Sequence, residues 1–314
     1  MKTENIKISS EQKSTYFDTN GVIDSETQKE RIPGLNPESS HRTSIYSPER
    51  MRNGIYPWHW HDEVECFYMK SGSMYYCLDG EEIFFHPGDV GFLNSGVLHM
   101  TKGVNGDNSG RQLNHVFPPE LIQADRDSLL YQKYMKPLLS NRAARIIRIK
   151  ADDPLAEDLR TWLDEANITA HEAVFGYEYR LRHSLTQVWL AFLQAMPPAC
   201  EWEGEADSMR LKQMLIWIQA NYDRRFSLEE LAASAHISSK ECERCFRRRI
   251  NMLPFDYVMD YRLEQARQLL QAGNLPVTEI GLRCGFGSPS YFGKCFREKY
   301  GVTPREYRVS GFQI

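Results

Sequence analysis

A short pattern that occurs twice near the C-terminus constrains the fold of this chain more than any other feature. The residues of the first occurrence return 50 positions later: Cys245-Phe246-Arg247, Pro254 and Tyr257 correspond to Cys295-Phe296-Arg297, Pro304 and Tyr307. A repeat of about 50 residues can build a solenoid, but two copies are too few for one. The pattern therefore predicts two copies of one small helical unit.

Each copy contains start and stop signals for two helices joined by a short turn. In the first copy, Ser227 begins one helix, Ser238 begins the next, and Asn251 ends it. In the second copy, a helix ends at Gly285 and another begins at Ser288. Serine caps helix N-termini, and glycine or asparagine accepts the left-handed conformation that ends a helix. This spacing predicts two helix-turn-helix units.

The second helix of each unit would carry the residues that contact DNA. Phe246 and Phe296 mark its buried face, so the opposite face points outward. We expect six side chains there to reach base edges in a major groove: Lys240, Glu243, Arg244, Ser290, Tyr291 and Lys294. Five basic side chains towards the helix ends would neutralise phosphates: Arg247, Arg248, Arg249, Arg297 and Lys299. A single such charge is more often only solvated, and the duplicated arrangement is what favours a DNA interface.

A helix over Phe255–Gln271 would join the two units and fix their relative position. Two reading helices about 34 Å apart would enter successive major grooves on one face of DNA. Charge supports this, because residues 208–314 contain 17 Lys and Arg against 11 Asp and Glu, a net of +6. The rest of the chain has 21 against 31, a net of −10. Only the C-terminal region is therefore expected to contact a polyanion.

Residues 55–118 have the composition of short strands, with aromatic and β-branched runs interrupted by turn residues. Asp79-Gly80 lies between two such runs and predicts a hairpin. Several strands at this spacing indicate a barrel or sandwich, with one further edge strand near Thr43–Tyr46. We expect four regions: a polar, partly disordered lead-in (1–41), a barrel followed by helices that mediate dimerisation (42–197), a linker (198–207) and the double helix-turn-helix domain (208–314).

A stripe of apolar residues follows the barrel at helical spacing. Its members are Val174, Tyr177, Leu181, Leu185, Val188 and Phe192. A stripe of this kind packs on a core or forms the seam of a homodimer, and its periodicity is the same in both cases. Both interpretations stay open at this stage.

The C-terminal region resembles the DNA-binding domain of AraC-type transcription regulators over about residues 208–309. The matching motifs are Ile280-Gly281-x3-Gly285-Phe286, Ser290-Tyr291-Phe292-x3-Phe296 and Gly301-x-Thr303-Pro304-x2-Tyr307-Arg308. Gly281 stands where the family usually has alanine, which costs roughly 1 kcal/mol of helix stability. Asn251 replaces the usual glycine after the first reading helix, a position where asparagine is tolerated. Neither departure changes the assignment.

A second resemblance lies in the predicted barrel. Gly54-x4-His59-x-His61-x3-Glu65-x6-Gly72 is close to the first motif of cupin domains, and Pro87-Gly88-Asp89 with His99 resembles the second. His59, His61 and Glu65 share one face of an extended strand, because strand side chains alternate. We expect six residues to form an effector pocket: His59, His61, Glu65, Tyr68, Tyr76 and His99.

Two interpretations of the histidines follow from these resemblances. The side chains of His59, His61, Glu65 and His99 could bind a divalent metal, as in cupin enzymes. AraC-type sensor barrels have the same pattern, and most of them are not known as metalloenzymes. We therefore expect these residues to form hydrogen bonds or to be structural, with no catalytic residue and no cofactor other than a small-molecule effector.

The resemblances imply an α+β protein with an N-terminal cupin-like barrel and associated helices, followed by an all-α domain of two helix-turn-helix units. Such a protein would be a ligand-responsive, sequence-specific transcription regulator, more often an activator, of a carbohydrate-related operon. Its partners would be double-stranded promoter DNA, RNA polymerase, a small effector such as a sugar, and a second copy of the chain. The alternatives are a metal-dependent cupin enzyme with a DNA-binding tail and a constitutive DNA binder whose barrel only dimerises.

The cellular compartment is inferred from two features that the sequence lacks, a membrane-spanning segment and a signal peptide. No apolar run approaches the roughly 18 residues that span a membrane, and residues 1–20 are too polar for a signal peptide. The seven cysteines are odd in number and scattered. We expect a cytoplasmic protein with reduced thiols and no membrane contact.

Overall fold

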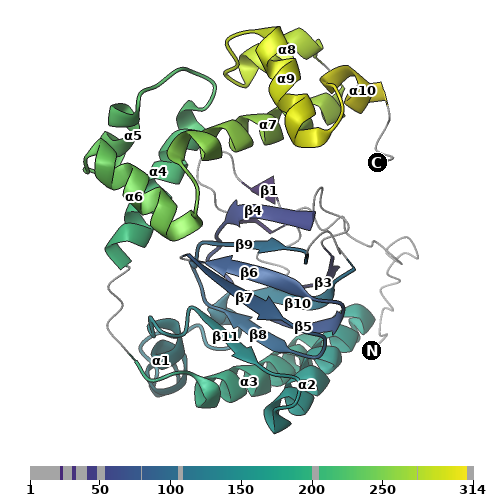
Figure 1. The fold of residues 1–314 in the computed structure, drawn as a ribbon. Helices are drawn as coiled ribbons and strands as arrows, with labels where there is room; N and C mark the ends of the chain where they lie inside the picture. The colour runs from purple at the N-terminus through teal and green to yellow at the C-terminus, as the bar shows by residue number, and fades with distance from the viewer. Residues whose placement is uncertain are drawn as a thin grey trace, which may run out of the picture.

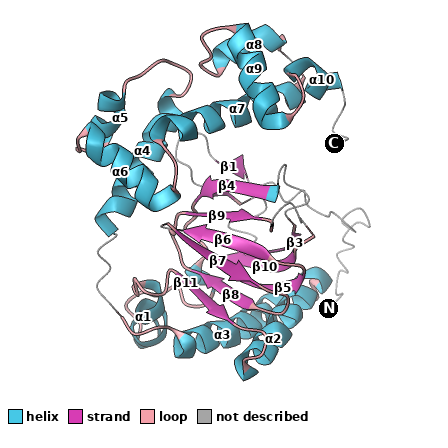
Figure 2. Cartoon of the chain, viewed as in Figure 1, coloured by secondary structure: helices cyan, strands magenta, loops and turns pink. Residues whose placement is uncertain are grey.

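The computed structural model describes residues 22–23, 30–32, 41–47, 54–78, 80–104, 109–199, 205–273 and 275–309. A β-rich N-terminal half is followed by an all-helical C-terminal part (Figures 1 and 2). The strands are β1 (Val22–Ile23), β2 (Glu30–Arg31), β3 (Arg42–Tyr46), β4 (Ile55–His59), β5 (Val64–Ser71), β6 (Met74–Leu78), β7 (Glu81–Phe85), β8 (Val90–Leu93), β9 (His99–Lys102), β10 (Arg111–Phe117) and β11 (Ile146–Ile149). The helices are η4 (Pro119–Leu121), η5 (Tyr131–Met135), α1 (Lys136–Leu139), α2 (Pro154–Glu172), α3 (Tyr177–Ala195), α4 (Glu205–Asn221), α5 (Leu228–Ser234), α6 (Ser239–Ile250), α7 (Pro254–Ala272), α8 (Val277–Arg283), α9 (Pro289–Tyr300) and α10 (Pro304–Val309). Most of the predicted lead-in (1–41) and residues 200–204 of the predicted linker lie outside the described residues.

The predicted barrel consists of two antiparallel sheets. One has the strand order β11-β8-β5-β10-β3 and the other β4-β9-β6-β7, while β1 and β2 form a separate pair. The hairpin predicted from the Asp-Gly dipeptide is confirmed, because β6 pairs with β7 and Leu78 lies opposite Glu81. Gly80 has the positive φ (79°) that such a turn requires. Of this dipeptide, Asp79 lies outside the described residues.

Strand alternation divides β5 between two environments. Phe67 and Met69 belong to a cluster in the barrel interior, together with Tyr76 of β6 and Phe85 of β7. Cys66, one residue out of phase, belongs instead to the core beneath α2 and α3. Because every second side chain faces the interior, this strand supplies both the lining of the barrel and the surface on which the helices pack.

The apolar stripe of α3 packs against the barrel. Leu181, Leu185, Val188 and Phe192 are all buried, in one core with β5, β8 and α2. Figure 1 shows α2 and α3 lying along the five-stranded sheet. The core interpretation of the stripe is therefore confirmed for these four residues, whereas Val174, at its start, is 47% exposed.

The predicted helix signals of the C-terminal region are confirmed. Ser227 forms a capping box at the start of α5, and Ser238 and Ser288 cap α6 and α9. The ends of α6 and α9 are followed by Asn251 and Gly301, both in the left-handed conformation. In the structure, α4 already begins within the predicted 198–207 linker, so a domain cut at 208 would divide this helix.

Two hydrophobic cores hold the C-terminal part together. The first unit, α4 to α6, shares its core with the first half of α7 and with outward-facing barrel residues such as Trp58, Cys77 and Leu98. The second unit, α8 to α10, packs around the second half of α7. The first unit is therefore in apolar contact with the barrel.

Cys242 and Cys245 form a Cys-x-x-Cys pair on the buried side of α6, so the cysteines are not all scattered as expected. Burial raises the pKa of both thiols to about 12, so they are protonated core residues and poor nucleophiles at neutral pH. In the described part of the chain, no helix is long and apolar enough to cross a membrane.

Candidate functional site

A small cavity lies inside the barrel, between the two sheets. Its volume is about 60 Å³, which is room for a few water molecules. Its lining comes from β3, β4, β5, β6, β9 and β10 and their connections: Ile32, Arg42, Ser44, Tyr46, Tyr56, His59, His61, Glu65, Tyr76, His99, Thr101, Gln112, Asn114 and Val116. Five of the six residues predicted for the effector pocket are in this set.

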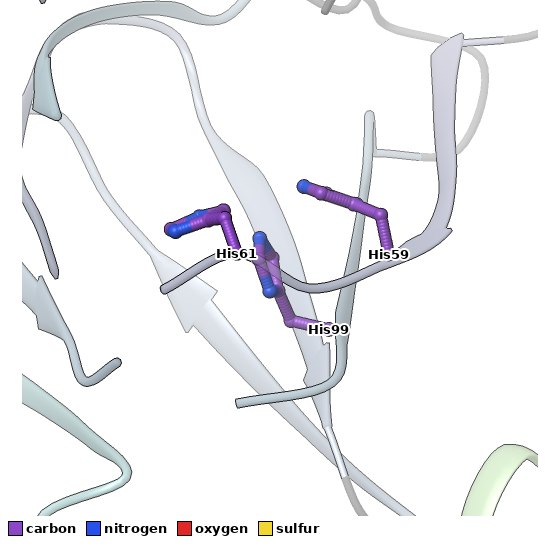
Figure 3. Close-up of side chains that lie close together, drawn as sticks. All are labelled: His59, His61 and His99. Atoms are coloured by element: carbon purple, nitrogen blue, oxygen red, sulfur yellow. The ribbon is translucent and has the colours of Figure 1, made fainter. Parts of the chain in front are cut away.

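Three histidines of the cavity lining lie close together (Figure 3). The ring centroids of His59 and His99 are 4.0 Å apart, and those of His61 and His99 are 5.3 Å apart. One ring nitrogen from each of the three lies within 4.8 Å of the others. His59 and His61 come from the end of β4 and the residues after it, and His99 begins β9, so the pairing of these strands brings them together.

Backbone carbonyl groups fix the orientation of all three rings. Nδ1 of His59 is 2.8 Å from the oxygen of Pro57, Nδ1 of His61 is 3.0 Å from that of Glu63, and Nδ1 of His99 is 2.9 Å from that of Val97. A carbonyl oxygen only accepts, so each Nδ1 carries the hydrogen and the lone pair of a neutral ring resides on Nε2. These bonds hold each ring in one tautomer.

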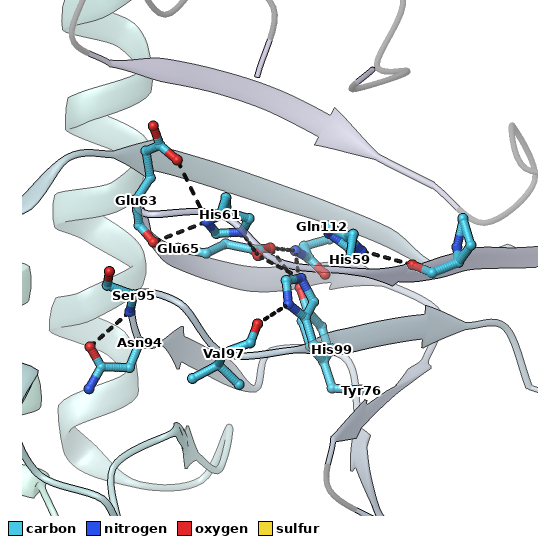
Figure 4. A network of polar contacts seen from close by, with 11 residues as sticks. His59, His61, Glu63, Glu65, Tyr76, Asn94, Ser95, Val97, His99 and Gln112 are labelled. Carbon is cyan, nitrogen blue, oxygen red and sulfur yellow. Dashed lines mark hydrogen bonds and ion pairs between the residues drawn. The ribbon is translucent and has the colours of Figure 1, made fainter. Parts of the chain in front are cut away.

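Glu65 lies beside the histidines (Figure 4). One of its oxygens is 3.8 Å from Nε2 of His61 and 3.9 Å from Nε2 of His99. The other accepts hydrogen bonds from the hydroxyl of Tyr76 (2.8 Å) and the amide of Gln112 (3.2 Å). Burial alone would raise the pKa of Glu65, but the adjacent His61, His99 and Tyr76 outweigh it and hold that pKa below its usual value. Glu65 is therefore a buried carboxylate.

His59 and His99 are neutral at physiological pH. Burial, with His61 acting in the same direction, lowers the pKa of His59 to about 3. Burial and the neighbouring His59 also hold the pKa of His99 well below its ordinary value. Neutral imidazoles with Nδ1–H bonded to a carbonyl, beside a carboxylate, are the donors that divalent transition metals prefer. The residues present thus fit a metal ion, which His59, His61 and His99 would hold with Glu65.

Two acceptor atoms in the cavity lining are buried without a hydrogen-bond partner. They are Oε1 of Gln112 and Oδ1 of Asn114, both from β10. A buried acceptor without a partner is costly, so these positions fit a ligand or water that brings hydroxyl or N–H donors. Sequence reasoning missed both residues. The signal was the two-residue spacing of Gln112 and Asn114 on either side of Leu113, which places both amides on one face of the strand.

Tyr68, the sixth predicted pocket residue, lies elsewhere. Its hydroxyl donates to Asp164 of α2 (2.8 Å), and its ring belongs to the core beneath the helices. Side chains alternate between the two faces of a strand. Tyr68 is three residues from Glu65, so the two side chains lie on opposite faces of the sheet. Asp89 of the second cupin-like motif is structural, since its carboxylate binds Arg148 (2.7 Å) and the backbone of Ala151 (2.9 Å).

The candidate nucleic-acid interface is formed by α6 and α9. Their apolar faces are buried through Phe246, Phe292 and Phe296. Of the six residues predicted to read bases, five are exposed and Glu243 is half-buried. Arg244 and Lys294 project from the two helices at equivalent positions, with side chains 62% and 71% exposed.

The five predicted phosphate contacts divide into two groups. Arg247, Arg248 and Arg297 are exposed, and Lys299 is half-buried. Arg248 pairs with Asp207 of α4 (2.5 Å), and Lys299 pairs with Asp260 (2.5 Å). Arg249 is only 7% exposed and lies 3.5 Å from Asp207 of α4. As placed in this structure, Arg249 supports the contact between α4 and α6 and does not reach a phosphate.

Comparison with known proteins supports this division of the chain. Residues 231–310 match the helix-turn-helix domain family, and residues 51–111 match the cupin domain family. An uncharacterized HTH-type transcriptional regulator of Bacillus subtilis, YdeC, is 29% identical over 273 residues, covering 87% of this chain and 91% of that protein. The HTH-type transcriptional activator RhaS of Mannheimia succiniciproducens is 25% identical over 265 residues, covering 81% of this chain and 90% of that protein.

Among solved structures, a transcriptional regulator of Chromobacterium violaceum with an AraC-type DNA-binding domain is 32% identical over 33% of this chain and 94% of its own, with a TM-score of 0.32. The family matches and the relatives agree with the structure on the same two-part organisation, a β-rich domain followed by two helix-turn-helix units. The chain thus has a cupin domain followed by an AraC-type helix-turn-helix domain, and the relatives that it matches over most of their length are HTH-type transcriptional regulators.

Proposed function

We propose that this regulator reads two successive major grooves of one DNA site with α6 and α9. The observation that supports this most is the pair of exposed polar faces on two equivalent helices, each capped and anchored in the same way. The proposed base-reading residues are Lys240, Glu243, Arg244, Ser290, Tyr291 and Lys294. The proposed phosphate contacts are Arg247, Arg248, Arg297 and Lys299.

Selection from a random DNA library with the purified full chain tests this proposal. We expect the selected sequences to contain two conserved boxes about one helical turn apart, centre to centre. Footprinting of a selected site should show protection in two adjacent major grooves on one face. Selected sequences with a single box, or no enrichment, would contradict the proposal.

We infer further that the cavity in the barrel binds a small polar effector. Support comes from the converging histidines, the ionised Glu65, and the acceptors of Gln112 and Asn114. A sugar is consistent with these hydrogen-bonding groups, but the cavity as described would have to widen to admit one. A divalent metal is the second candidate, favoured by the three Nδ1–H bonds to carbonyl groups.

Metal analysis and thermal unfolding distinguish the two candidates. If the effector is a metal, purified full chain should contain about one ion per chain and EDTA should lower Tm. If it is a sugar, a panel of pentoses and hexoses should include one that raises Tm with no metal present. His61→Ala should abolish either response, and Tyr68→Phe, outside the cavity, should preserve it. Turnover of a substrate by the metal-loaded protein would favour the enzyme alternative.

A route for the ligand response connects the cavity with the DNA-binding part. The backbone of His61 accepts a hydrogen bond from Gly96 N (2.8 Å), and the carbonyl of Gly96 accepts one from Lys212 of α4. Lys212 also lies over the ring of Trp60, 4.9 Å from its centroid. A change in the position of His61 would therefore be transmitted to α4. We expect Lys212→Met to reduce the effect of the ligand on DNA affinity more than it reduces ligand binding, and equal losses would contradict this route.

Activation of transcription is the proposed outcome of binding, by analogy with RhaS, whose name describes an activator. The target would be a carbohydrate-related operon and the second partner RNA polymerase, in the cytoplasm. Transcription in vitro from a promoter with the selected site should increase when the full chain and its effector are present. A decrease would identify a repressor.

We also propose a homodimer. The apolar stripe of α3 is used in the core, so the contact would lie at the turn between α2 and α3, where Phe175, Ile168 and Tyr179 are exposed. Phe175→Ser should convert a dimer into a folded monomer in sedimentation analysis. A monomeric wild type at micromolar concentration would contradict the proposal.

A further inference from the structure

Arg262 of α7 forms two hydrogen bonds to the segment that follows α4 in the first helix-turn-helix unit. Its Nε donates to the carbonyl of Tyr222 (2.7 Å), and its Nη2 donates to the carbonyl of Arg224 (2.7 Å). Both carbonyl groups follow the end of α4, in the first unit. Hydrogen bonds from a charged guanidinium are stronger than those between neutral groups, so Arg262 holds this segment firmly against α7.

The other side of the same guanidinium faces the second unit. Gly285, in the turn between α8 and α9, approaches so closely that a Cβ atom there would lie 2.9 Å from Nε of Arg262 and would collide with the carbonyl of Tyr222. The ring of Tyr222 also packs on the core of the second unit. Arg262 therefore lies where the end of α4 meets the turn that precedes the second reading helix.

The position of Arg262 within α7 matters because the two cores divide at this point. Tyr257 and Val258 belong to the core of the first unit, and Leu263 and Ala266 belong to that of the second. A helix of this length can curve gently, so α7 by itself leaves some freedom in the relative position of the two separately packed units. The contact of Arg262 with Tyr222, Arg224 and Gly285 adds a second connection beside the helix, and two connections restrict this motion.

We propose that Arg262 is a specificity-determining positioning residue that fixes the spacing and angle between α6 and α9. The inference rests on the proposed function, in which both helices read one site. One inserted base pair moves the second box by about 3.4 Å and about 35°. A rigid pair of units would reject such a site, whereas units that move relative to each other would accept it. Arg262 thus determines which spacing of the two boxes the protein accepts.

The test compares full-length wild type, Arg262→Gln and Arg267→Gln on one selected DNA site. Arg267 is the matched control, because it is an arginine of the same helix whose hydrogen bonds to Glu264 and Tyr307 stay within α7 and the second unit. Binding is measured on the selected spacing, on sites with one or two base pairs inserted or removed, and on DNA with a single box. Thermal unfolding shows whether each variant is folded, and Arg262→Lys replaces the glutamine variant if that one is not.

We expect an inserted base pair to weaken wild-type binding by about tenfold or more, as a mismatched base pair would. For Arg262→Gln this ratio should fall by at least about threefold, while binding to a single box is unchanged. Arg267→Gln should keep the wild-type ratio. A variant at 262 with the wild-type ratio, or with equal losses on single-box and two-box DNA, would overturn the inference and leave the proposed function standing. Wild-type protein that binds all spacings with equal affinity would overturn the inference. Selected sites without two boxes would overturn both the inference and the proposed function.

Discussion

Replacement of Arg244 by alanine removes the side chain that we expect to read a base from α6. In the structure this side chain is 62% exposed and forms an ion pair with Glu241, one turn earlier. Alanine is the strongest helix former, so α6 should stay intact, and an exposed pair at this spacing contributes only about 0.2–0.5 kcal/mol. The lost contact to a base costs about 1–3 kcal/mol. DNA binding should therefore weaken by roughly 5- to 150-fold while the free energy of unfolding changes little.

The assay measures Kd by fluorescence anisotropy for the full chain on its selected site and on sites with each base pair changed in turn. Lys294→Ala is the partner variant, because Lys294 occupies the equivalent position on α9 and is 71% exposed. Each substitution should relax base preference in a different half of the site. If both variants lose preference in the same half, the assignment of one helix to each box is wrong.

Arg297→Ala is the control for a phosphate contact. Its loss should weaken binding to all sequences alike and reduce the slope of log K against log salt by about 0.9. Arg244→Ala with wild-type affinity and wild-type base preference would refute the reasoning, because it would show that this exposed face does not enter a groove.

Three further predictions concern packing and pH. Leu185→Asp places a charge in the core between α3 and the sheet, so circular dichroism should show an unfolded sensor half and not a folded monomer. A chain of residues 205–314 should have a higher Tm than one of 208–314, because only the longer chain keeps Asp207 and its pairs with Arg248 and Arg249, and equal values would contradict this. Burial, together with the neighbouring His41, holds the pKa of His115 well below 6.5. As the pH falls, His115 is therefore protonated in the unfolded chain before it is protonated in the folded one. The free energy of unfolding in urea should fall by roughly 1.4 kcal/mol per pH unit below about 6.5 for this group, and His115→Gln should reduce the slope.

The two helix-turn-helix units could be predicted because their signals are local. Ser227, Ser238 and Ser288 cap helices through backbone groups only three residues away, so the sequence around them is sufficient. The hairpin between β6 and β7 was predictable for the same reason. Local hydrogen bonding and turn geometry do not depend on the rest of the fold.

The wrong assignments concern residues whose environment depends on tertiary contacts or on which face of a strand the side chain occupies. Arg249 has the sequence context of a phosphate contact, but α4 covers it and supplies Asp207, which no local pattern indicates. Tyr68 was assigned to the pocket by residue type, although its odd offset from Glu65 places it on the other face of β5. The stripe containing Leu185 was ambiguous because a core and a dimer seam require the same periodicity.

The positions of the two reading helices depend on different contacts. The barrel holds the first unit through Trp58, Leu98 and the bond from Gly80 N to the carbonyl of Arg249 (2.7 Å). The second unit is connected to the first by α7 and by the contacts of Arg262. If Arg262 keeps the two units rigid, an effector that shifts the barrel moves both helices together and changes access to the whole site without changing the spacing it requires. Regulation and sequence specificity would then be controlled at separate contacts, so Lys212→Met should alter the first alone and Arg262→Gln the second alone.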